Sequence, residues 1–383
     1  MGDRNQGMKI EIGKNSAQKE GFSAFTPAPF PPAGIFDLPQ QILIKTAEAG
    51  MLVGKLDGIT HTLPDVDFFL RMFVSKDAAS SAQIEGTKAT LVDAIEMDAG
   101  VATVKTDADD ILYYIKALNY GAKRLKEFPL SLRLIREIHS RLMTGARATH
   151  FSDPGEFRRS QNWIGGTAPS NALFVPPSVS DMHRSLDDFE KFLHNETETL
   201  PLIHIALAHA QFETIHPFLD GNGRTGRLLI TLLLCHRNLL ERPVLFLSSY
   251  FKKHRKVYYE RLSGYPNGQV EAWALFFMEG VIETAHESIQ ISKEIRKLRD
   301  DDMAKIQGLA KRESESGVLV LSRLYANPII TSRSIMNWTH FTRAGAQKVI
   351  DRLVALGILQ AREAKGSYDR TYIYRKYVEI FLK

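Results

Sequence analysis

The sequence contains almost no cysteine. Its 383 residues include one, Cys235, so an internal disulfide framework is excluded and a reducing compartment is favoured. Long apolar runs are also missing, because none reaches the roughly 18–20 residues that cross a bilayer. Nor does the start contain the apolar core of a signal peptide. We therefore expect a cytoplasmic protein without a membrane partner. The polar stretch Met1–Gly7 leaves Met8 as an alternative natural start.

A large excess of one charge is absent as well. Lys and Arg number 49 against 44 Asp and Glu, and hydrophobic residues make up 44% of the chain. This composition is that of an ordinary globular protein, and the length suggests about two or three domains. The basic excess is uneven, because residues 331–383 hold ten basic against four acidic residues, a net charge of +6, whereas the whole chain has +5.

The most informative stretch runs from His216 to Arg227, with the sequence HPFLDGNGRTGR. It combines an imidazole, a carboxylate, three glycines and two arginines. The preceding segment, Pro201–Ile215, has the apolar spacing of one helix face, and the apolar run Leu228–Cys235 follows at once. We predict a glycine-rich loop between two helices, of which the second is central and buried.

Three familiar glycine motifs do not fit this stretch. Gly221, Gly223 and Gly226 have the spacing of a dinucleotide-binding fingerprint, but that fingerprint requires a preceding strand and a βαβ unit. A phosphate-binding P-loop would need Lys at Arg227, and again a strand before it. An EF-hand loop would need Gly at Thr225 and a Glu at the twelfth position, which is Thr231.

The residue types themselves indicate a polyphosphate site. Glycines let backbone N–H groups approach an anion, and the N-terminus of the following helix favours negative charge. Arg224 and Arg227 can fork onto phosphate oxygens, and Asp220 offers an oxygen ligand for Mg²⁺. His216 is the group with an ordinary pKa near neutrality, so it can take a proton from an attacking hydroxyl. The set predicts phosphoryl-type transfer from a nucleotide to a hydroxyl.

Most of the remaining chain has helical patterns. The proline-rich segment Phe25–Pro32 predicts polyproline-like chain, and Gly58 and Pro64 are expected to break the first helix. A helix at about Ser75–Glu85 should end at Gly86 and carry Ser81 and Glu85 on one face. A β-hairpin around Gly165-Gly166, from about Trp163 to Pro176, would be the only sheet-like element of the first 300 residues. Residues 311–316 predict a linker.

The C-terminal residues predict a separate unit. A helix at residues 317–325 and a short helix opening at Thr331 precede a third, Arg343–Leu356, for which Thr342 is a good N-cap. Two strands around residues 365–370 follow. This order resembles a winged helix-turn-helix. Its basic excess fits a DNA backbone, but a protein-interaction or dimerisation unit with a solvated basic face fits equally well.

The His216–Arg227 stretch matches, residue for residue, the Fic family signature His-x-Phe-x-(Asp/Glu)-Gly-Asn-Gly-Arg-x-x-Arg. Ser81 to Gly86 resembles the family's inhibitory motif, Ser/Thr-x-x-x-Glu-Gly/Asn, and the hairpin resembles its target-docking flap. The resemblance implies a mainly α fold, a Fic-type helical bundle with a β-hairpin flap, here followed by a winged helix-turn-helix. The expected domains are 1–106, with the inhibitory motif, 107–310, the catalytic core, and 317–383.

By this resemblance the chain is a protein adenylyltransferase, which moves AMP from ATP to a Ser, Thr or Tyr hydroxyl of a target protein docked on the flap. His216 is then the general base and Asp220 holds Mg²⁺, while Phe218 anchors the loop in the core. Residues implied to bind ATP are Ile164, Gly165, Gly221, Asn222, Gly223, Arg224, Thr225, Gly226, Arg227, Tyr258 and Tyr259. A homodimer is also implied.

The resemblance gives Glu85, with Ser81 in the same motif, an inhibitory role. Glu85 would pair with Arg227 and keep the γ-phosphate of ATP out of its productive pose. Two alternatives remain at this point. The chain could be a DNA-binding regulator whose core senses a nucleotide, or Glu85 could position water for removal of AMP from a modified protein. Related cores also transfer phosphate or phosphocholine.

Overall fold

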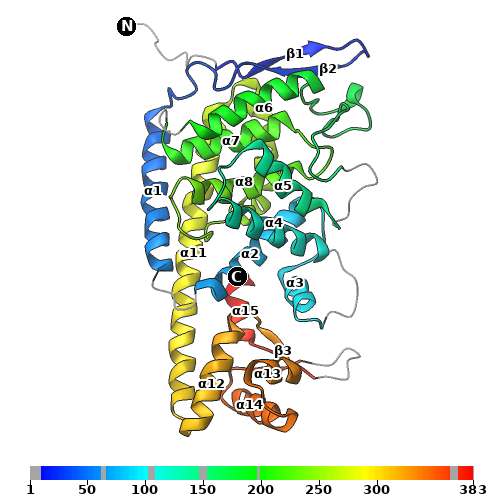
Figure 1. The fold of residues 1–383 in the computed structure, drawn as a ribbon. Helices are drawn as coiled ribbons and strands as arrows, with labels where there is room; N and C mark the ends of the chain where they lie inside the picture. Colours follow the sequence, from blue (N-terminus) through cyan, green and yellow to red (C-terminus); the bar gives the residue numbers. More distant parts are fainter. Residues whose placement is uncertain are drawn as a thin grey trace. The chain divides into compact units, whose positions relative to one another are not determined.

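A computed structural model describes residues 10–61, 66–101, 108–145, 153–195, 199–362 and 370–382 (Figure 1). The described chain is mainly helical, as predicted. It forms two compact units, which are described separately below. The first comprises the chain up to Gly54 together with Tyr113–Ala285, and the second comprises Lys55–Leu112 with His286–Lys383. Helices α1, α4 and α11 have residues in both units, and the predicted domain boundaries stay predictions.

The first unit is built around two buried helices, α7 and α8. α7 starts with proline at its first position, which suits a helix N-terminus, and α8 is buried along most of its length, as its apolar sequence predicts. α7 packs on both α6 and α8 (Figure 1). The helices with residues in this unit are α1 (Gln40–Thr60), α4 (Ala108–Arg124), α5 (Leu132–Met143), α6 (Val179–His194), α7 (Pro201–Ile215), α8 (Asn222–His236), α9 (Ser248–Lys253), α10 (Arg255–Gly264) and α11 (Val270–Gln307).

The N-terminal segment forms a hairpin. Strands β1 (Gly13–Ala17) and β2 (Ser23–Pro27) pair antiparallel, with Gly13 opposite Pro27. The predicted polyproline-like chain is therefore wrong for the first part of residues 25–32. Phe25 is buried, and its N–H donates to the carbonyl of Val175 at 2.9 Å. Packing of the Phe25 side chain thus stabilises a β-hairpin that the proline-rich sequence alone does not predict.

The segment around Gly165 is less regular than the predicted β-hairpin. Its pairing is a single antiparallel bridge between Ile164 and Phe174, with the Ile164 N–H 2.8 Å from the Phe174 carbonyl. Gly165 and Gly166 both have positive φ, and Pro169–Asn171 forms the 3₁₀ turn η1. We call residues 158–177 the flap. Because β1 and β2 also lie before residue 300, the flap is not the only extended pairing there.

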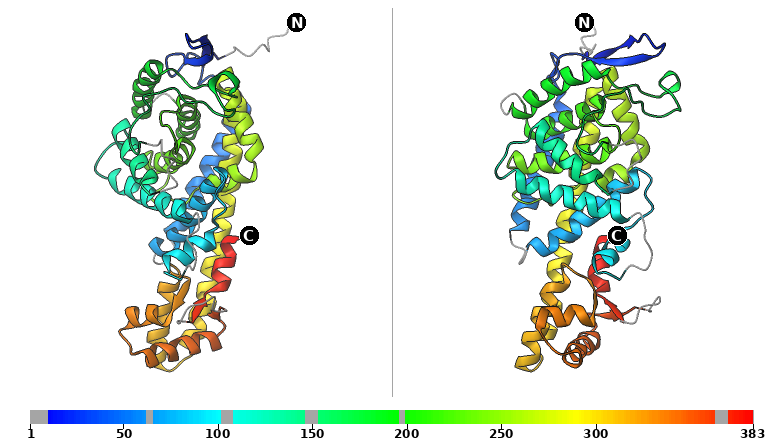
Figure 2. Two further views of the ribbon diagram at one scale, coloured as in Figure 1. Left: turned by 90° about the vertical axis from the view of Figure 1, so that its right-hand side faces the viewer. Right: turned by 45° about the vertical axis from the view of Figure 1, so that its right-hand side comes forward.

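The second unit contains a small sheet of order β3-β5-β4, antiparallel throughout. Thr342 caps α14 by accepting the Gly345 N–H, as predicted. Figure 2 shows α12–α14 gathered around this sheet. The elements that lie wholly in the second unit are α2 (Val66–Ile84), α3 (Leu91–Asp98), α12 (Lys311–Leu324), β3 (Ile329–Thr331), α13 (Ser332–Thr339), α14 (Arg343–Ala355), β4 (Gln360–Ala361), β5 (Thr371–Ile373) and α15 (Arg375–Leu382). The winged-helix identity of this region stays a prediction.

Several predicted boundaries are wrong. Gly58 lies inside α1, where the flanking Leu56 and Thr60 are buried, and this packing outweighs the roughly 1 kcal/mol that glycine costs in a helix. The helix predicted at about Ser75–Glu85 is the second half of one longer helix, α2. The expected linker at residues 311–316 is the first part of α12, because Ser316 and Gly317 begin its buried face.

Some expectations lie outside the described residues, namely those for Met1–Gly7, Pro64 and the turn at 365–369 of the expected wing. None of the helices in the described ranges is both long enough and apolar enough to span a membrane.

Candidate active site

The predicted loop links α7 to α8. His216 caps α7 in a left-handed conformation, with φ 50°, and its N–H donates to the Phe212 carbonyl at 3.0 Å. Gly221, with φ 79°, is the N-cap of α8. α8 begins at Asn222, six residues before the predicted start at Leu228, so residues 223–227 occupy its first turns. The loop proper is therefore short.

Asn222 closes the loop with two hydrogen bonds. Its Oδ1 accepts the Phe218 N–H at 2.9 Å, and its Nδ2 donates to the Phe218 carbonyl at 2.8 Å. The Phe218 side chain is fully buried, as expected for an anchor. Asn222 is thus a structural part of the loop, whatever it contributes to a ligand.

His139 of α5 also holds the loop, and it is not among the residues predicted from the sequence. Its Nδ1 accepts the Gly155 N–H at 2.9 Å, so Nε2 carries the proton that bonds the Asp220 carbonyl, also at 2.9 Å. Burial lowers the pKa of His139 to about 4, so it is neutral at physiological pH. No local pattern identified it, because its partners are backbone groups of other segments.

A backbone carbonyl contacts one ring nitrogen of His216. Its Nδ1 lies 3.2 Å from the Glu213 carbonyl, and because a carbonyl only accepts, Nδ1 must carry the proton. Nε2 then keeps its lone pair, as a general base requires. The His216 carbonyl accepts Nε of Arg158 at 3.0 Å, which fixes the backbone on the opposite side.

Charged groups surround the N-terminus of α8. Arg224 and Arg227 are 7% and 3% exposed, and Arg224 Nη2 lies 3.6 Å from Asp220 Oδ1. The Asp220 side chain is 34% exposed, and its Oδ1 also accepts the Gly221 N–H at 2.6 Å. Two guanidinium groups, a helix N-terminus and one accessible carboxylate form a site suited to an anion with a counter-cation.

The residues present fit Mg²⁺ bound together with phosphates. In the described part of the chain, no group of three or more His, Cys, Asp or Glu side chains could hold a metal alone. Mg²⁺ commonly uses one or two carboxylates and takes its other ligands from phosphate oxygens and water. Asp220 can supply that single carboxylate.

Gly226 allows α7 and α8 to approach each other closely. A Cβ atom at this position would lie 2.4 Å from Oε1 of Glu213 and 3.2 Å from Cε1 of His209. Any larger residue would displace these side chains or the first turns of α8. The third glycine of the motif therefore has a packing reason, besides any contact with phosphate.

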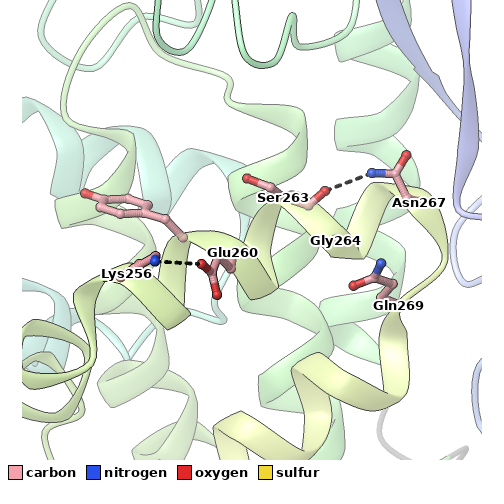
Figure 3. Close-up of a pocket in the computed structure, with 7 residues that line it drawn as sticks. Lys256, Glu260, Ser263, Gly264, Asn267 and Gln269 are labelled. Atoms are coloured by element: carbon pink, nitrogen blue, oxygen red, sulfur yellow. Dashed lines mark hydrogen bonds and ion pairs between the residues drawn. The ribbon is translucent and has the colours of Figure 1, made fainter.

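The two predicted tyrosines of α10 have different environments. Tyr258 is 1% exposed and its hydroxyl lies 2.9 Å from Nε2 of His209. Tyr259 is 41% exposed and lines a surface pocket of about 570 Å³ together with Lys256, Glu260, Ser263, Gly264, Asn267 and Gln269. Figure 3 shows Asn267 bonded to the Ser263 carbonyl and Lys256 paired with Glu260. Of the pair, Tyr259 is therefore the exposed one.

The flap carries the other two predicted ATP-binding residues, Ile164 and Gly165. Ile164 is 37% exposed, and Gly165 has φ 70°. The legs of the flap are tied to the loop by Arg158 and Asn162, since Asn162 Nδ2 donates to the Phe218 carbonyl at 3.0 Å. Neither side chain is among the site residues predicted from the sequence.

The predicted inhibitory residues lie in the second unit. Ser81 is fully buried on α2, whereas Glu85 follows the last residue of that helix and is exposed. They do not share a helix face, because α2 ends at Ile84. The loop belongs to the first unit, so the pairing of Glu85 with Arg227 stays a prediction.

Comparison with family models gives two matches. Residues 129–234 match the Fic/DOC family, and residues 43–123 match the Fic/DOC family N-terminal region. Among curated proteins, protein adenylyltransferase Fic of Drosophila grimshawi is 30% identical over 217 residues, which cover 55% of this chain and 40% of that protein. Its Aedes aegypti counterpart is 35% identical over 155 residues, covering 39% and 27%. The chain thus spans less than half the length of these relatives.

Solved structures share the fold. A Fic family protein from Desulfovibrio desulfuricans superposes with a TM-score of 0.55 at 16% identity, covering 88% of this chain and 96% of that one. Residues 134–508 of Fic-1 from C. elegans superpose with a TM-score of 0.50 at 20% identity, covering 66% and 74%. The predicted Fic-type helical fold is therefore confirmed. Residues 43–123 and 129–234 thus resemble, in that order, the N-terminal region and the Fic/DOC region of that family.

Proposed function

We propose that the chain is a protein adenylyltransferase that transfers AMP from ATP to a hydroxyl group of a protein. Nε2 of His216 takes the proton of a Ser, Thr or Tyr hydroxyl as its oxygen attacks the α-phosphorus. A new phosphorus–oxygen bond forms, the bond to the bridging oxygen breaks, and pyrophosphate leaves. The observation that carries this proposal is the Nδ1 contact of His216 with the Glu213 carbonyl, which leaves Nε2 as the base.

The start of α8 would bind the triphosphate. Arg224 and Arg227 are held there with little exposure, and a guanidinium group in a largely buried site is an effective partner for phosphate oxygens. Asp220 would hold Mg²⁺, which neutralises phosphate charge when bound. Tyr259, Ile164 and Gly165 are proposed to line the adenosine side of the site.

The flap is proposed to dock the target by strand addition. Ile164 pairs with Phe174 through both its N–H and its carbonyl, so in an extended chain the backbone groups of the preceding Trp163 would face the opposite edge. Trp163, Ile164 and the 88% exposed Leu173 offer apolar contacts beside that edge. Assembly into a homodimer and restraint of the reaction by Glu85 are parts of the same proposal.

DNA binding is the weaker candidate. The exposed Arg343 and Lys348 on α14 favour it. However, Arg352 pairs with Glu313, and Gln347 Nε2 donates to Asp351 at 2.8 Å, so both are engaged within the unit. Duplex binding whose affinity falls steeply with salt would support this candidate, whereas salt-independent or absent binding would contradict it.

The proposed reaction is tested with ATP labelled on either the α- or the γ-phosphate. The chain is incubated with Mg²⁺ and each nucleotide, and label on protein is measured for the chain itself and for a cell lysate. Transfer from α-labelled ATP alone is expected. Transfer from γ-labelled ATP would indicate a phosphate transferase, and transfer from neither, also in Glu85→Gly, would contradict the proposal.

A further inference from the structure

Arg158 joins three parts of the first unit. Its Nε donates to the His216 carbonyl at 3.0 Å, its Nη1 to the Ser160 carbonyl at 3.2 Å and its Nη2 to the Pro177 carbonyl at 2.5 Å. Its own N–H donates to the Pro217 carbonyl at 2.9 Å. One side chain thus binds the loop and both legs of the flap.

The guanidinium group is unusually placed for a structural cation. Arg158 is 1% exposed, and in the described part of the structure its side-chain hydrogen bonds all go to backbone carbonyls. Burial lowers its pKa to about 10, so it remains charged at neutral pH. Burying a charge without a carboxylate is costly, and only the planar fork of arginine reaches three separate carbonyls.

Neighbouring amides reinforce the same connection. Asn162 donates to the Phe218 carbonyl at 3.0 Å and lies 3.4 Å from the His216 carbonyl. Gln161 donates to the Pro176 carbonyl at 2.9 Å. The ascending and descending legs of the flap are therefore fixed to each other, and the ascending leg is fixed to the backbone beside the catalytic histidine.

We propose that Arg158 is a positioning residue that sets the flap in register with His216, so that a target segment docked on the flap presents its hydroxyl to Nε2. The expected effect on AMP transfer rests on the proposed function. The connection of the flap to the loop through Arg158 can be tested without catalysis. Arg158 itself touches neither the target nor ATP in this account. It acts through the His216 and Pro177 carbonyls.

The test compares Arg158→Met and Arg158→Lys with Arg237→Met in the full chain. Arg237 is a matched control, because it also donates to a backbone carbonyl in the first unit, that of Asn195 at 2.8 Å. Amide hydrogen exchange is followed over the flap and over α7 and α8. ATP affinity and the rate of labelling from α-labelled ATP are measured in parallel.

We expect exchange at the Ile164, Leu173 and Phe174 amides to rise by about 10- to 100-fold in Arg158→Met, since hydrogen bonds from a charged donor are lost. Arg158→Lys should give a smaller rise, because lysine keeps the charge but lacks the fork. In both variants ATP affinity should stay within about twofold of wild type while the labelling rate falls. Arg237→Met should leave flap exchange unchanged.

Two results would overturn the inference. One is unchanged flap exchange in both Arg158 variants, and the other is a rise spread equally over α7 and α8, which marks a general loss of stability. If Arg158→Met does not fold, Arg158→Lys alone decides between these outcomes. If amide exchange rises only in the flap of a chain that never transfers label, the positioning role is supported and the proposed function is contradicted. Failure of this inference and failure of the proposed function are therefore distinguishable.

Discussion

The ring of His139 stacks on the ring of Phe218, with centroids 3.6 Å apart and planes within 4° of each other. The same imidazole binds the Gly155 N–H and the Asp220 carbonyl. One buried side chain thus holds both Phe218, two residues after His216, and the backbone of Asp220, the proposed metal ligand. This contact helps to fix the short loop between α7 and α8, which ends at the left-handed Gly221.

Replacing His139 should therefore disturb the loop. In His139→Leu, the Gly155 N–H and the Asp220 carbonyl lose their partner, at a cost of about 1–3 kcal/mol each in unfolding free energy. His139→Gln retains one acceptor and one donor and should lose less. Urea unfolding together with ATP affinity in Mg²⁺ measures both effects. Equal stability of the two variants would contradict the bridging role.

Acid should destabilise the first unit through its buried histidines. Burial lowers the pKa of His209 to about 3 and that of His204 to about 4, from an ordinary value of 6.5. Because the unfolded state binds protons first, the contribution of the two neutral histidines to stability is complete above pH 6.5. It is lost as the pH falls toward their pKa values in the folded state. The pH dependence of unfolding free energy measures it.

His209→Gln isolates one of these groups. Its slope of unfolding free energy against pH, below pH 6.5, should be smaller than that of wild type by up to about 1.4 kcal/mol per pH unit. His183→Gln, at an exposed position on α6, serves as the control and should match wild type. A His209→Gln slope equal to that of wild type would contradict the assignment.

Gly226→Ala should weaken ATP binding and lower stability by about 1–3 kcal/mol, because the added methyl group overpacks the contact between α7 and α8. Gly54→Ala is the matched control. Gly54 lies on α1 with nothing within 4 Å of a Cβ atom, so alanine there should stabilise by up to about 1 kcal/mol. Thermal unfolding and ATP titration measure the pair, and a neutral Gly226→Ala would contradict the packing argument.

The sequence groups the proposed site residues together but does not reveal the residues that support them. His216, Asp220, Arg224 and Arg227 lie within one short stretch, so the chain itself brings them together. His139 and Arg158 act on backbone groups from distant segments, and such partners leave no local pattern. The Thr342 cap was predictable because a capping bond depends on residues three apart.

Boundaries were predicted less well where tertiary packing decides them. Gly58 and the charged residues 311–316 suggested breaks, yet both lie within helices because neighbouring side chains are buried. The early start of α8 depends on the left-handed Gly221 and on the Asn222 bridge to Phe218. Neither follows from apolar periodicity.

In the proposed reaction His216 is the general base for AMP transfer, and Glu85 restrains the transfer. The most direct measurement is incorporation of α-labelled ATP into protein by wild type, Glu85→Gly and Glu85→Gly/His216→Ala. Glu85→Gly should incorporate more label than wild type, and the added His216→Ala should reduce incorporation by about 10²- to 10⁴-fold, since the general base is lost. Equal incorporation by wild type and Glu85→Gly would contradict the restraint, and undiminished incorporation by the double variant would contradict the role of His216.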